Sequence, residues 1–319
     1  MKILIADKFE DFGLTELKNR GFEVIFDPSL KEDSLHAALK EQDPDVLVVR
    51  STKVPAEMTA NAGKLALIIR AGAGYDTIDI KAARNNDIAV ANCPGMNSTA
   101  VAELTMGLML SVDRRIPDQV ADLRQGKWNK KGWSSVGQGL KGKTLGLIGV
   151  GQIGRLVARR AMAFEMKVIY NDIVPCEELD NDDRARRVER DELLQQADVV
   201  SLHVPALEST YHLIDADALS KMKNTALLIN TTRGSVVDQE ALITALKNGD
   251  IGFAALDVYE NEPAATDDTI SNGLLNLPNF YGTHHVGAST RQAQLAVAEE
   301  VIRILDEYNK SKEVINCVN

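Results

Sequence analysis

Short apolar runs, separated by polar turns and helix-like stretches, recur along the chain. The first series is Ile3–Ala6, Val46–Val49, Leu65–Ile69 and Ile88–Ala91. The second series is Thr144–Ile148, Lys167–Tyr170, Val199–Leu202, Ala226–Ile229, Gly252–Leu256 and Phe280–Gly282. Short runs that are apolar throughout and rich in Val, Ile and Leu are typical of strands buried on both faces of a parallel sheet. Helix-like stretches between them, such as Arg155–Phe164 and Asp238–Asn248, predict an α/β fold with two doubly wound parallel sheets.

The length and charge of the chain limit what it can be. Its 319 residues exceed most single hydrophobic cores, so two domains are expected. A formal net charge of −10 argues against nucleic-acid or membrane partners, which need a basic face. The three cysteines are far apart and fit neither a disulfide framework nor a metal site, and the N-terminus lacks the apolar core of a signal peptide. We therefore expect a cytoplasmic protein with reduced thiols and no metal.

A glycine-rich turn, Gly149-Val150-Gly151-Gln152-Ile153-Gly154, follows the predicted strand Thr144–Ile148 and opens a predicted helix. In that context the glycines allow a tight turn and a close approach to a pyrophosphate, whose charge the helix N-terminus favours. The next predicted strand leads to Asp172, which would accept hydrogen bonds from ribose hydroxyls and repel a 2′-phosphate. The pattern predicts a Rossmann-type domain that binds NAD in preference to NADP.

A second glycine motif, from Gly137 to Thr144, matches the phosphate-binding loop G-x-x-x-x-G-K-T letter for letter. That chemistry needs a strand before the loop and a helix after it, so that backbone amides converge on the phosphates. Here a polar, Gly-rich stretch precedes the motif and a predicted strand follows it. We interpret the match as a coincidence. A nucleotidase that binds ATP or GTP through Lys143 is the alternative from another class.

Arg233, Glu262 and His285 each follow a different strand of the second series. Because ligands bind beyond the carboxyl ends of the strands in an open parallel sheet, we expect all three on the rim that carries the glycine turn. An arginine holds a substrate carboxylate, and an imidazole takes the proton of a hydroxyl whose carbon loses hydride. A carboxylate beside the imidazole fixes its orientation and favours its protonated form. The set predicts hydride transfer between a nicotinamide and a hydroxylated carbon.

The chain resembles the D-isomer-specific 2-hydroxyacid dehydrogenases over nearly its whole length. The matching blocks are Arg70–Asp76, Gly149–Gly154, Ile229–Gly234, Asp257–Pro263 and His285–Thr290. The resemblance implies that Arg233, Glu262 and His285 are the catalytic residues. It implies a cofactor groove formed by Gly149, Gly151, Gln152, Ile153, Gly154, Asp172, Val204, Pro205, Thr231, Thr232, Asp257, His285 and Gly287. It also implies a small-molecule substrate bound by Arg50, Ser51, Lys53, Ala73, Gly74, Asn97, Arg233 and His285.

The resemblance further implies a domain arrangement and a partner. A flavodoxin-like substrate domain would comprise residues 1–97 and 289–319, with the NAD-binding Rossmann domain inserted as residues 98–288. Closure of the cleft between them would exclude water from hydride transfer. The arm around Leu123–Gly139 resembles the segment through which family members form homodimers.

Within the family, the Val49–Val54 block and the Pro94–Ser98 turn most resemble D-3-phosphoglycerate dehydrogenases. Arg50 and Lys53 would hold the substrate's phosphate, which implies interconversion of D-3-phosphoglycerate and 3-phosphohydroxypyruvate in serine biosynthesis. The family's usual Arg-Ser-x-Thr spacing is one residue short here. Because no regulatory domain follows Asn319, feedback inhibition by serine through such a domain is not expected.

His284 stands where the family commonly has proline before its catalytic histidine. The following Gly287-Ala288-Ser289 sets the register, so His285 is predicted to be the catalytic one. Two other functions share these patterns, namely a hydroxypyruvate or glyoxylate reductase and a non-catalytic NADH-binding or corepressor module. The complete Arg–Glu–His set favours an enzyme over such a module.

Overall fold

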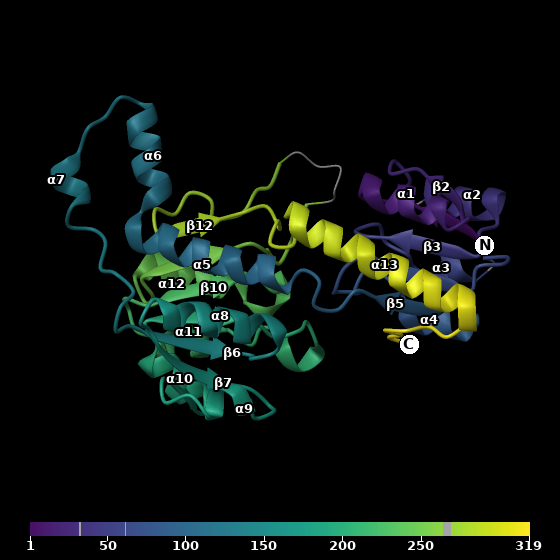
Figure 1. The fold of residues 1–319 in the computed structure, drawn as a ribbon. Helices are drawn as coiled ribbons and strands as arrows, with labels where there is room; N and C mark the ends of the chain where they lie inside the picture. Colours follow the sequence, from purple (N-terminus) through teal and green to yellow (C-terminus); the bar gives the residue numbers. More distant parts are fainter. Residues whose placement is uncertain (32, 61, 264–268) are drawn as a thin grey trace. The chain divides into compact units, whose positions relative to one another are not determined.

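The computed structural model describes residues 1–31, 33–60, 62–263 and 269–319, and it divides into two compact units. The first unit comprises Met1–Asn97 and Ala288–Asn319, and the second comprises Ser98–Gly287. Ala288 therefore lies in the first unit, one position before the boundary expected from the sequence. Both units are α/β structures built on parallel sheets (Figure 1). Among the described residues, no helix combines the length and apolar character that crossing a membrane requires.

The first unit has a flavodoxin-like strand order. Its strands are β1 (Lys2–Ile5), β2 (Glu23–Phe26), β3 (Val46–Val49), β4 (Leu67–Arg70) and β5 (Ala89–Asn92). Its helices are α1 (Asp11–Asn19), α2 (Asp33–Gln42), α3 (Ala56–Thr59), α4 (Ile80–Asn85) and α13 (Arg291–Ser311). The strands pair in the order β2-β1-β3-β4-β5, and every pair is parallel. This order confirms the predicted doubly wound architecture of the unit.

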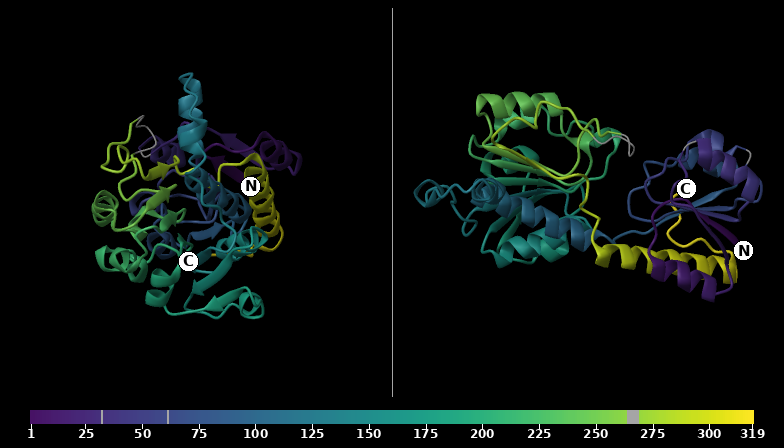
Figure 2. Two further views of the ribbon diagram at one scale, coloured as in Figure 1. Left: turned by 90° about the vertical axis from the view of Figure 1, so that its left-hand side faces the viewer. Right: turned by 90° about the horizontal axis from the view of Figure 1, so that it is seen from above.

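The sheet of the first unit is covered on both faces. Successive side chains of a strand point to opposite faces, so Ile3 and Ile5 pack with residues of α1 and α13, whereas Leu4 packs with residues of α2, α3 and α4. Figure 2 shows α1 and α13 together on one side of this sheet. Val301 and Leu305 of α13 are fully buried there. The last helix of the chain therefore completes a core that its first residues begin.

The second unit has the strand order of a dinucleotide-binding domain. Its strands are β6 (Thr144–Ile148), β7 (Lys167–Asn171), β8 (Ala185–Arg187), β9 (Val199–Leu202), β10 (Leu227–Asn230), β11 (Phe253–Leu256) and β12 (Phe280–Gly282). Its helices are α5 (Ser98–Arg114), α6 (Ile116–Arg124), α7 (Lys130–Trp133), α8 (Gln152–Ala163), α9 (Glu177–Asp180), α10 (Arg190–Gln196), α11 (Ala216–Lys221) and α12 (Gln239–Asn248), with 3-10 helices η1 (Glu208–Thr210) and η2 (Gly234–Val236). The parallel sheet runs β12-β11-β10-β9-β6-β7-β8.

The strand order of the second unit reverses direction between β6 and β9. The chain starts the sheet in the middle at β6, moves outward to β8, and returns to build β9 to β12 on the other side. Residues of α5 and α8 pack on one face of the sheet and residues of α10, α11 and α12 on the other. A crevice forms at such a reversal, outside the carboxyl ends of the strands, and ligands bind there. The fold thus places the candidate site at the ends of β6 and β9 to β12.

The helices α6 and α7 form an arm that projects from the sheet of the second unit (Figure 1). No described residue of α6 is buried, and Ile116, Val120 and Leu123 are large apolar side chains exposed along it. The arm is anchored at Arg115, whose guanidinium lies over the rings of Phe253 and Tyr281 and pairs with Asp118 at 2.7 Å. A helix that exposes several large apolar side chains and is anchored at its base is suited to packing against another protein surface.

Candidate active site

The turn between β6 and α8 is shaped by its glycines. Gly149 has a φ of +92°, and a Cβ there would lie 2.6 Å from the carbonyl oxygen of His203. A Cβ at Gly154 would overlap the carbonyl oxygen of Gly149, whereas a Cβ at Gly151 would meet nothing within 4 Å. Gly149 and Gly154 are therefore required by the packing of the turn itself. Gly151 instead leaves open space beside the N-terminus of α8, which fits the pyrophosphate of a dinucleotide.

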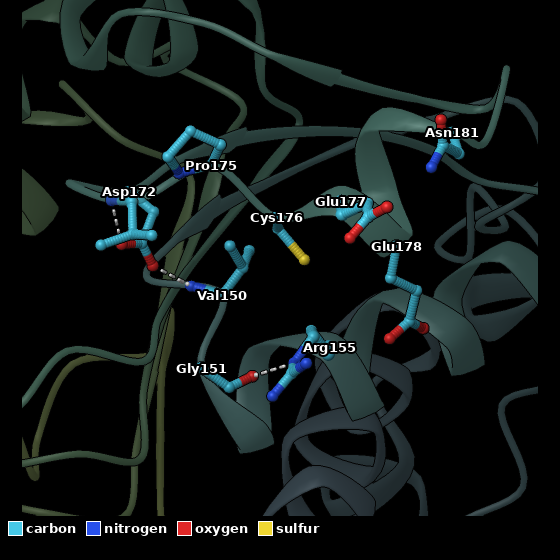
Figure 3. A pocket seen from close by; sticks show the side chains of 10 residues that line it. Val150, Gly151, Arg155, Asp172, Pro175, Cys176, Glu177, Glu178 and Asn181 are labelled. Atoms are coloured by element: carbon cyan, nitrogen blue, oxygen red, sulfur yellow. Dashed lines mark hydrogen bonds between the residues drawn. The ribbon is translucent and has the colours of Figure 1, made fainter.

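Asp172 closes the other side of this turn. Its two carboxylate oxygens accept hydrogen bonds from the backbone N–H groups of Val150 at 2.7 Å and Val174 at 3.0 Å. Figure 3 shows Asp172 and Gly151 at the same pocket, which has a volume of about 620 Å³ and is also lined by Arg155. The pocket lies where the adenosine half of a dinucleotide binds in this strand order. The predicted residues of the glycine turn and Asp172 are thus brought together.

His203, at the end of β9, was missed by the sequence interpretation. Burial lowers the pKa of His203 to about 3, so the imidazole is neutral. Its Nε2 lies 2.9 Å from the hydroxyl of Ser201, while its buried Nδ1 has no hydrogen-bond partner among the described residues. The signal in the sequence was a polar residue directly after a buried strand and before Val204-Pro205. A neutral side chain at this position adds no charge next to the glycine turn.

The loop after β10 positions Arg233. Asn230 is buried, and its side-chain NH2 group donates to the carbonyl oxygen of Arg233 at 2.9 Å. The side-chain oxygen of Asn230 accepts from the N–H and the hydroxyl of Thr232. The hydroxyl of Thr231 lies 3.1 Å from that of Thr105 on α5, which fixes the start of the loop. A Cβ at Gly234 would overlap the carbonyl oxygen of Tyr259, so this loop touches the loop after β11. The backbone of Arg233 is therefore held on both sides.

Asp257, at the end of β11, organises the backbone around His285. Its buried carboxylate accepts hydrogen bonds from the hydroxyl of Thr283 at 2.6 Å and from the N–H groups of Val286 at 2.9 Å and Gly287 at 2.8 Å. The N–H of His285 donates to the carbonyl oxygen of Asp257 at 2.8 Å. His285 has a φ of +52°, in the left-handed region that residues other than glycine adopt uncommonly. These bonds hold His285 in that conformation.

Glu262 and His285 form a hydrogen-bonded pair at the rim of the second unit. The Nδ1 of His285 lies 2.8 Å from the Oε2 of Glu262, and the Oε1 of Glu262 accepts from the N–H of Tyr259 at 3.1 Å. Burial tends to raise the pKa of Glu262, but its hydrogen bond to His285, the charges of His285 and Arg233 and the Tyr259 N–H lower that pKa overall. Glu262 is therefore a carboxylate at neutral pH. The neighbouring His284 is exposed.

The predicted substrate residues of the first unit do not all have free side chains. The Nη1 of Arg50 donates to the Oε1 of Gln294 at 2.8 Å. The carboxylate of Asp7 accepts hydrogen bonds from the N–H groups of Arg50 at 2.6 Å, Ser51 at 3.0 Å and Thr52 at 3.0 Å. Lys53 is exposed. Asp7 follows β1, and the sequence interpretation missed it although it stands at the carboxyl end of a buried strand.

Further predicted substrate residues follow β4 and β5. The carbonyl oxygen of Ala73 accepts from the side-chain amide of Asn92 at 2.6 Å, and Gly74 is half-buried. The Oδ1 of Asn97 is buried and has no hydrogen-bond partner within the described part of the chain. An amide oxygen in that state is suited to accept a hydrogen bond from a ligand or from water.

Residues 106–287, most of the second unit, match the family model described as "D-isomer specific 2-hydroxyacid dehydrogenase, NAD binding domain". The chain belongs to the D-isomer-specific 2-hydroxyacid dehydrogenases. NAD(H) is accordingly the cofactor of this dehydrogenase family member, in agreement with the open space at Gly151 and the pocket beside Asp172.

The names of the relatives of this chain give different substrates. D-3-phosphoglycerate dehydrogenase of Methanocaldococcus jannaschii is 41% identical over all of this chain, which spans 60% of the length of that relative. Hydroxypyruvate reductase of Thermotoga maritima is 41% identical, with 94% of this chain and 96% of the relative covered. The crystal structure of a glyoxylate reductase from Paecilomyes thermophila aligns with a TM-score of 0.88 at 31% identity, covering 100% of this chain and 98% of that one.

The phosphate-loop motif, Gly137 to Thr144, is bonded to a side chain of the protein itself. The N–H of Gly139 donates to the carboxylate of Asp113 at 3.1 Å, and the Nζ of Lys143 lies 3.7 Å from the same carboxylate. The strand β6, rather than a helix, follows the motif. A carboxylate stands where a phosphate would need to bind, so the geometry argues against a nucleotidase.

Proposed function

We propose that this protein is an NAD-dependent oxidoreductase that interconverts a small D-2-hydroxy acid and its 2-oxo acid. The observation that carries the proposal is the Glu262–His285 hydrogen bond of 2.8 Å at the strand ends of an NAD-binding unit, with Arg233 on the neighbouring loop. NAD(H), when bound, accepts or supplies the hydride.

Arg233, His285 and Glu262 each have one role in substrate binding or proton transfer. Arg233 binds the substrate's carboxylate through a planar, permanently charged guanidinium. His285 takes the proton of the C2 hydroxyl at its Nε2 during oxidation and returns it during reduction. Glu262 holds the ring through Nδ1, which keeps Nε2 directed at the substrate and stabilises the positive charge of the protonated imidazole. The backbone of His285, fixed by Asp257, sets the position of the ring.

For the substrate we favour 3-phosphohydroxypyruvate and D-3-phosphoglycerate, with a role in serine biosynthesis. The support is the D-3-phosphoglycerate dehydrogenase relative and the basic side chains of Arg50 and Lys53. In the first unit, Ala73, Gly74 and Asn97 would bind the carboxylate end of the substrate. The exposed Lys53 would then provide charge for the phosphate.

A specific observation favours a second candidate, a hydroxypyruvate or glyoxylate reductase. Asp7 already accepts the N–H groups of Arg50, Ser51 and Thr52, and the guanidinium of Arg50 is bonded to Gln294. Backbone donors of this loop are therefore committed, and a phosphate would depend on side chains alone. An unphosphorylated 2-oxo acid needs no such site.

A panel of 2-oxo acids tests both the reaction and the substrate. Purified protein is mixed with NADH and, separately, with phosphohydroxypyruvate, hydroxypyruvate, glyoxylate, pyruvate and 2-oxoglutarate, and NADH absorbance is followed. A kcat/KM preference for phosphohydroxypyruvate that falls at least tenfold in Lys53→Ala, with hydroxypyruvate turnover unchanged, supports the phosphoglycerate role. Preference for an unphosphorylated acid supports the second candidate. NADH binding without turnover of any acid refutes the enzyme and leaves a binding module.

We also propose that two copies assemble through the arm. The exposed Val120 and Leu123 lie on one face of α6, where a second copy of the chain would cover them. Light scattering of the wild-type protein and of the Val120→Asp/Leu123→Asp variant tests this proposal. A dimer that becomes a monomer in the variant supports it, and a monomeric wild type refutes it.

A further inference from the structure

His212 lies in a cluster of acidic side chains beside the proposed active site. Its Nε2 donates to the Oε1 of Glu260 at 2.6 Å, and its Nδ1 lies 3.8 Å from the Oδ2 of Asp238. The ring stacks on that of Tyr211, with centroids 4.0 Å apart. The side chains of His212 and Glu260 are 27% and 22% exposed, so solvent screens this hydrogen bond only partly.

The backbone of His212 is joined to the loop that carries Arg233. Its N–H donates to the carbonyl oxygen of Ser235 at 2.8 Å, two residues after Arg233. Next along the chain, the N–H of Ile214 donates to the carbonyl oxygen of Val236 at 3.1 Å. The segment after β9 therefore runs alongside the end of the Arg233 loop and is bonded to it.

The side chain of His212 is joined to the loop that carries Glu262. Glu260, its partner, stands two residues before Glu262. Directly before Glu260, the hydroxyl of Tyr259 donates to the carbonyl oxygen of Thr283 at 3.0 Å, which links the same loop to the segment of His285. His212 thus joins the Arg233 loop to the Glu262 loop, and Tyr259 joins the Glu262 loop to the segment of His285.

We infer that His212 is a positioning residue, which fixes the Glu262 loop against the Arg233 loop through its hydrogen bond to Glu260. The inference rests on the proposed roles of Arg233, Glu262 and His285. Loss of the bond frees the Glu262 loop, so that the carboxylate holds the ring of His285 in its productive orientation for a smaller fraction of the time. Misplacement of reacting groups by about 1 Å can lower turnover about 10²-fold. Cofactor affinity should change little, because the glycine turn is not part of these contacts.

The test replaces each partner while the backbone is preserved. His212 has a φ of +48°, so His212→Asn is chosen because Asn tolerates this conformation and is too short to reach Glu260. Glu260→Gln keeps the shape of the side chain, removes its charge and leaves one acceptor oxygen for two donors, the Nε2 of His212 and the N–H of Gln239. We expect each variant to lower kcat about tenfold, with the Kd for NADH, measured by fluorescence titration, within twofold of wild type. The double variant should be no slower than the slower single variant, because both changes act on the same His212–Glu260 hydrogen bond.

Controls separate positioning from general damage. Glu240→Gln removes an exposed charge of α12 close to the cluster and should keep kcat within twofold. In a Glu262→Gln background, His212→Asn should change kcat less than twofold, because its effect passes through Glu262. The inference is overturned if both single variants keep wild-type kcat, if their effects multiply in the double variant, or if His212→Asn still costs tenfold without Glu262. Wild-type turnover by Glu262→Gln would overturn the proposed role of Glu262 and, with it, this inference.

Discussion

Replacing Glu262 by glutamine probes the proposed acid–base pair directly. Glu262 accepts hydrogen bonds at both oxygens, from His285 at 2.8 Å and from the N–H of Tyr259 at 3.1 Å. A glutamine has one acceptor oxygen and one NH2 group, so it cannot accept both bonds. With the amide oxygen on Tyr259, the NH2 group faces Nδ1 of His285 and leaves the ring proton on Nε2. That nitrogen then has no lone pair for the substrate's proton.

The size of the effect follows from this geometry. General acid–base catalysis contributes roughly 10²–10⁴-fold, so kcat of Glu262→Gln should fall by about that factor. Two unit charges about 4 Å apart interact by about 4 kcal/mol at an effective dielectric constant near 20. Because the side chains of His285 and Glu262 are 48% and 34% exposed, screening reduces this to about 1 kcal/mol. Reduction needs the protonated ring, whose positive charge the carboxylate stabilises, so the rate of reduction should fall when the carboxylate is lost.

The assay is steady-state NADH oxidation between pH 5.5 and 9, with the preferred 2-oxo acid. NADH affinity should be unchanged, because the glycine turn and Asp172 are untouched, and an unchanged melting temperature would verify the fold. A kcat within threefold of wild type would refute the assigned role of Glu262.

Three further predictions follow from the second unit. Gly149→Ala should unfold at clearly lower urea concentration, because the added Cβ would lie 2.6 Å from the backbone of His203 at a φ of +92°. Gly151→Ala should keep the unfolding free energy within about 1 kcal/mol of wild type and yet lose NADH binding in a fluorescence titration. His285→Ala should abolish turnover while His284→Ala keeps most of it, and equal kinetic losses would be evidence against the assignment. Burial disfavours the charge of Asp198, but Lys223 and the N–H of Thr144 lower the pKa of Asp198 below 3.8. The stabilisation that this carboxylate provides is therefore complete above about pH 4 and is lost on acidification. Asp198→Asn should lower the unfolding free energy at pH 7 and flatten the decline of that free energy between about pH 4 and 2.

The sequence predicted the strands that are buried on both faces and the edge strands β5 and β12, but it missed the edge strands β2 and β8. Thr144–Ile148 and Val199–Leu202 coincide with β6 and β9, because such runs are apolar at every position. The strands β2 and β8 lie at the edges of their sheets, and Glu23 and Arg187 are among their exposed residues. Their sequences lack the continuous apolar run, since only part of each strand packs on the core.

The glycine turn was predictable because its constraint is local, as the packing of Gly149 and Gly154 demonstrates. The contacts of Asp7 and His212 could not be predicted, because each of them joins segments that are far apart in the sequence. No periodicity or motif specifies which acidic or imidazole side chain will cap a distant loop. Such pairings depend on how the strand ends converge once the sheet has formed.

The position of α13 has a consequence for synthesis on the ribosome. The strands of the first unit leave the ribosome early, yet Val301 and Leu305, which cover one face of their sheet, follow only after all of Ser98–Gly287 has been made. The second unit, by contrast, is one uninterrupted segment whose core can close by itself. We expect the NAD-binding unit of a nascent chain to complete its core first. One apolar face of the amino-terminal sheet stays exposed until α13 is made, and chaperones can bind that face.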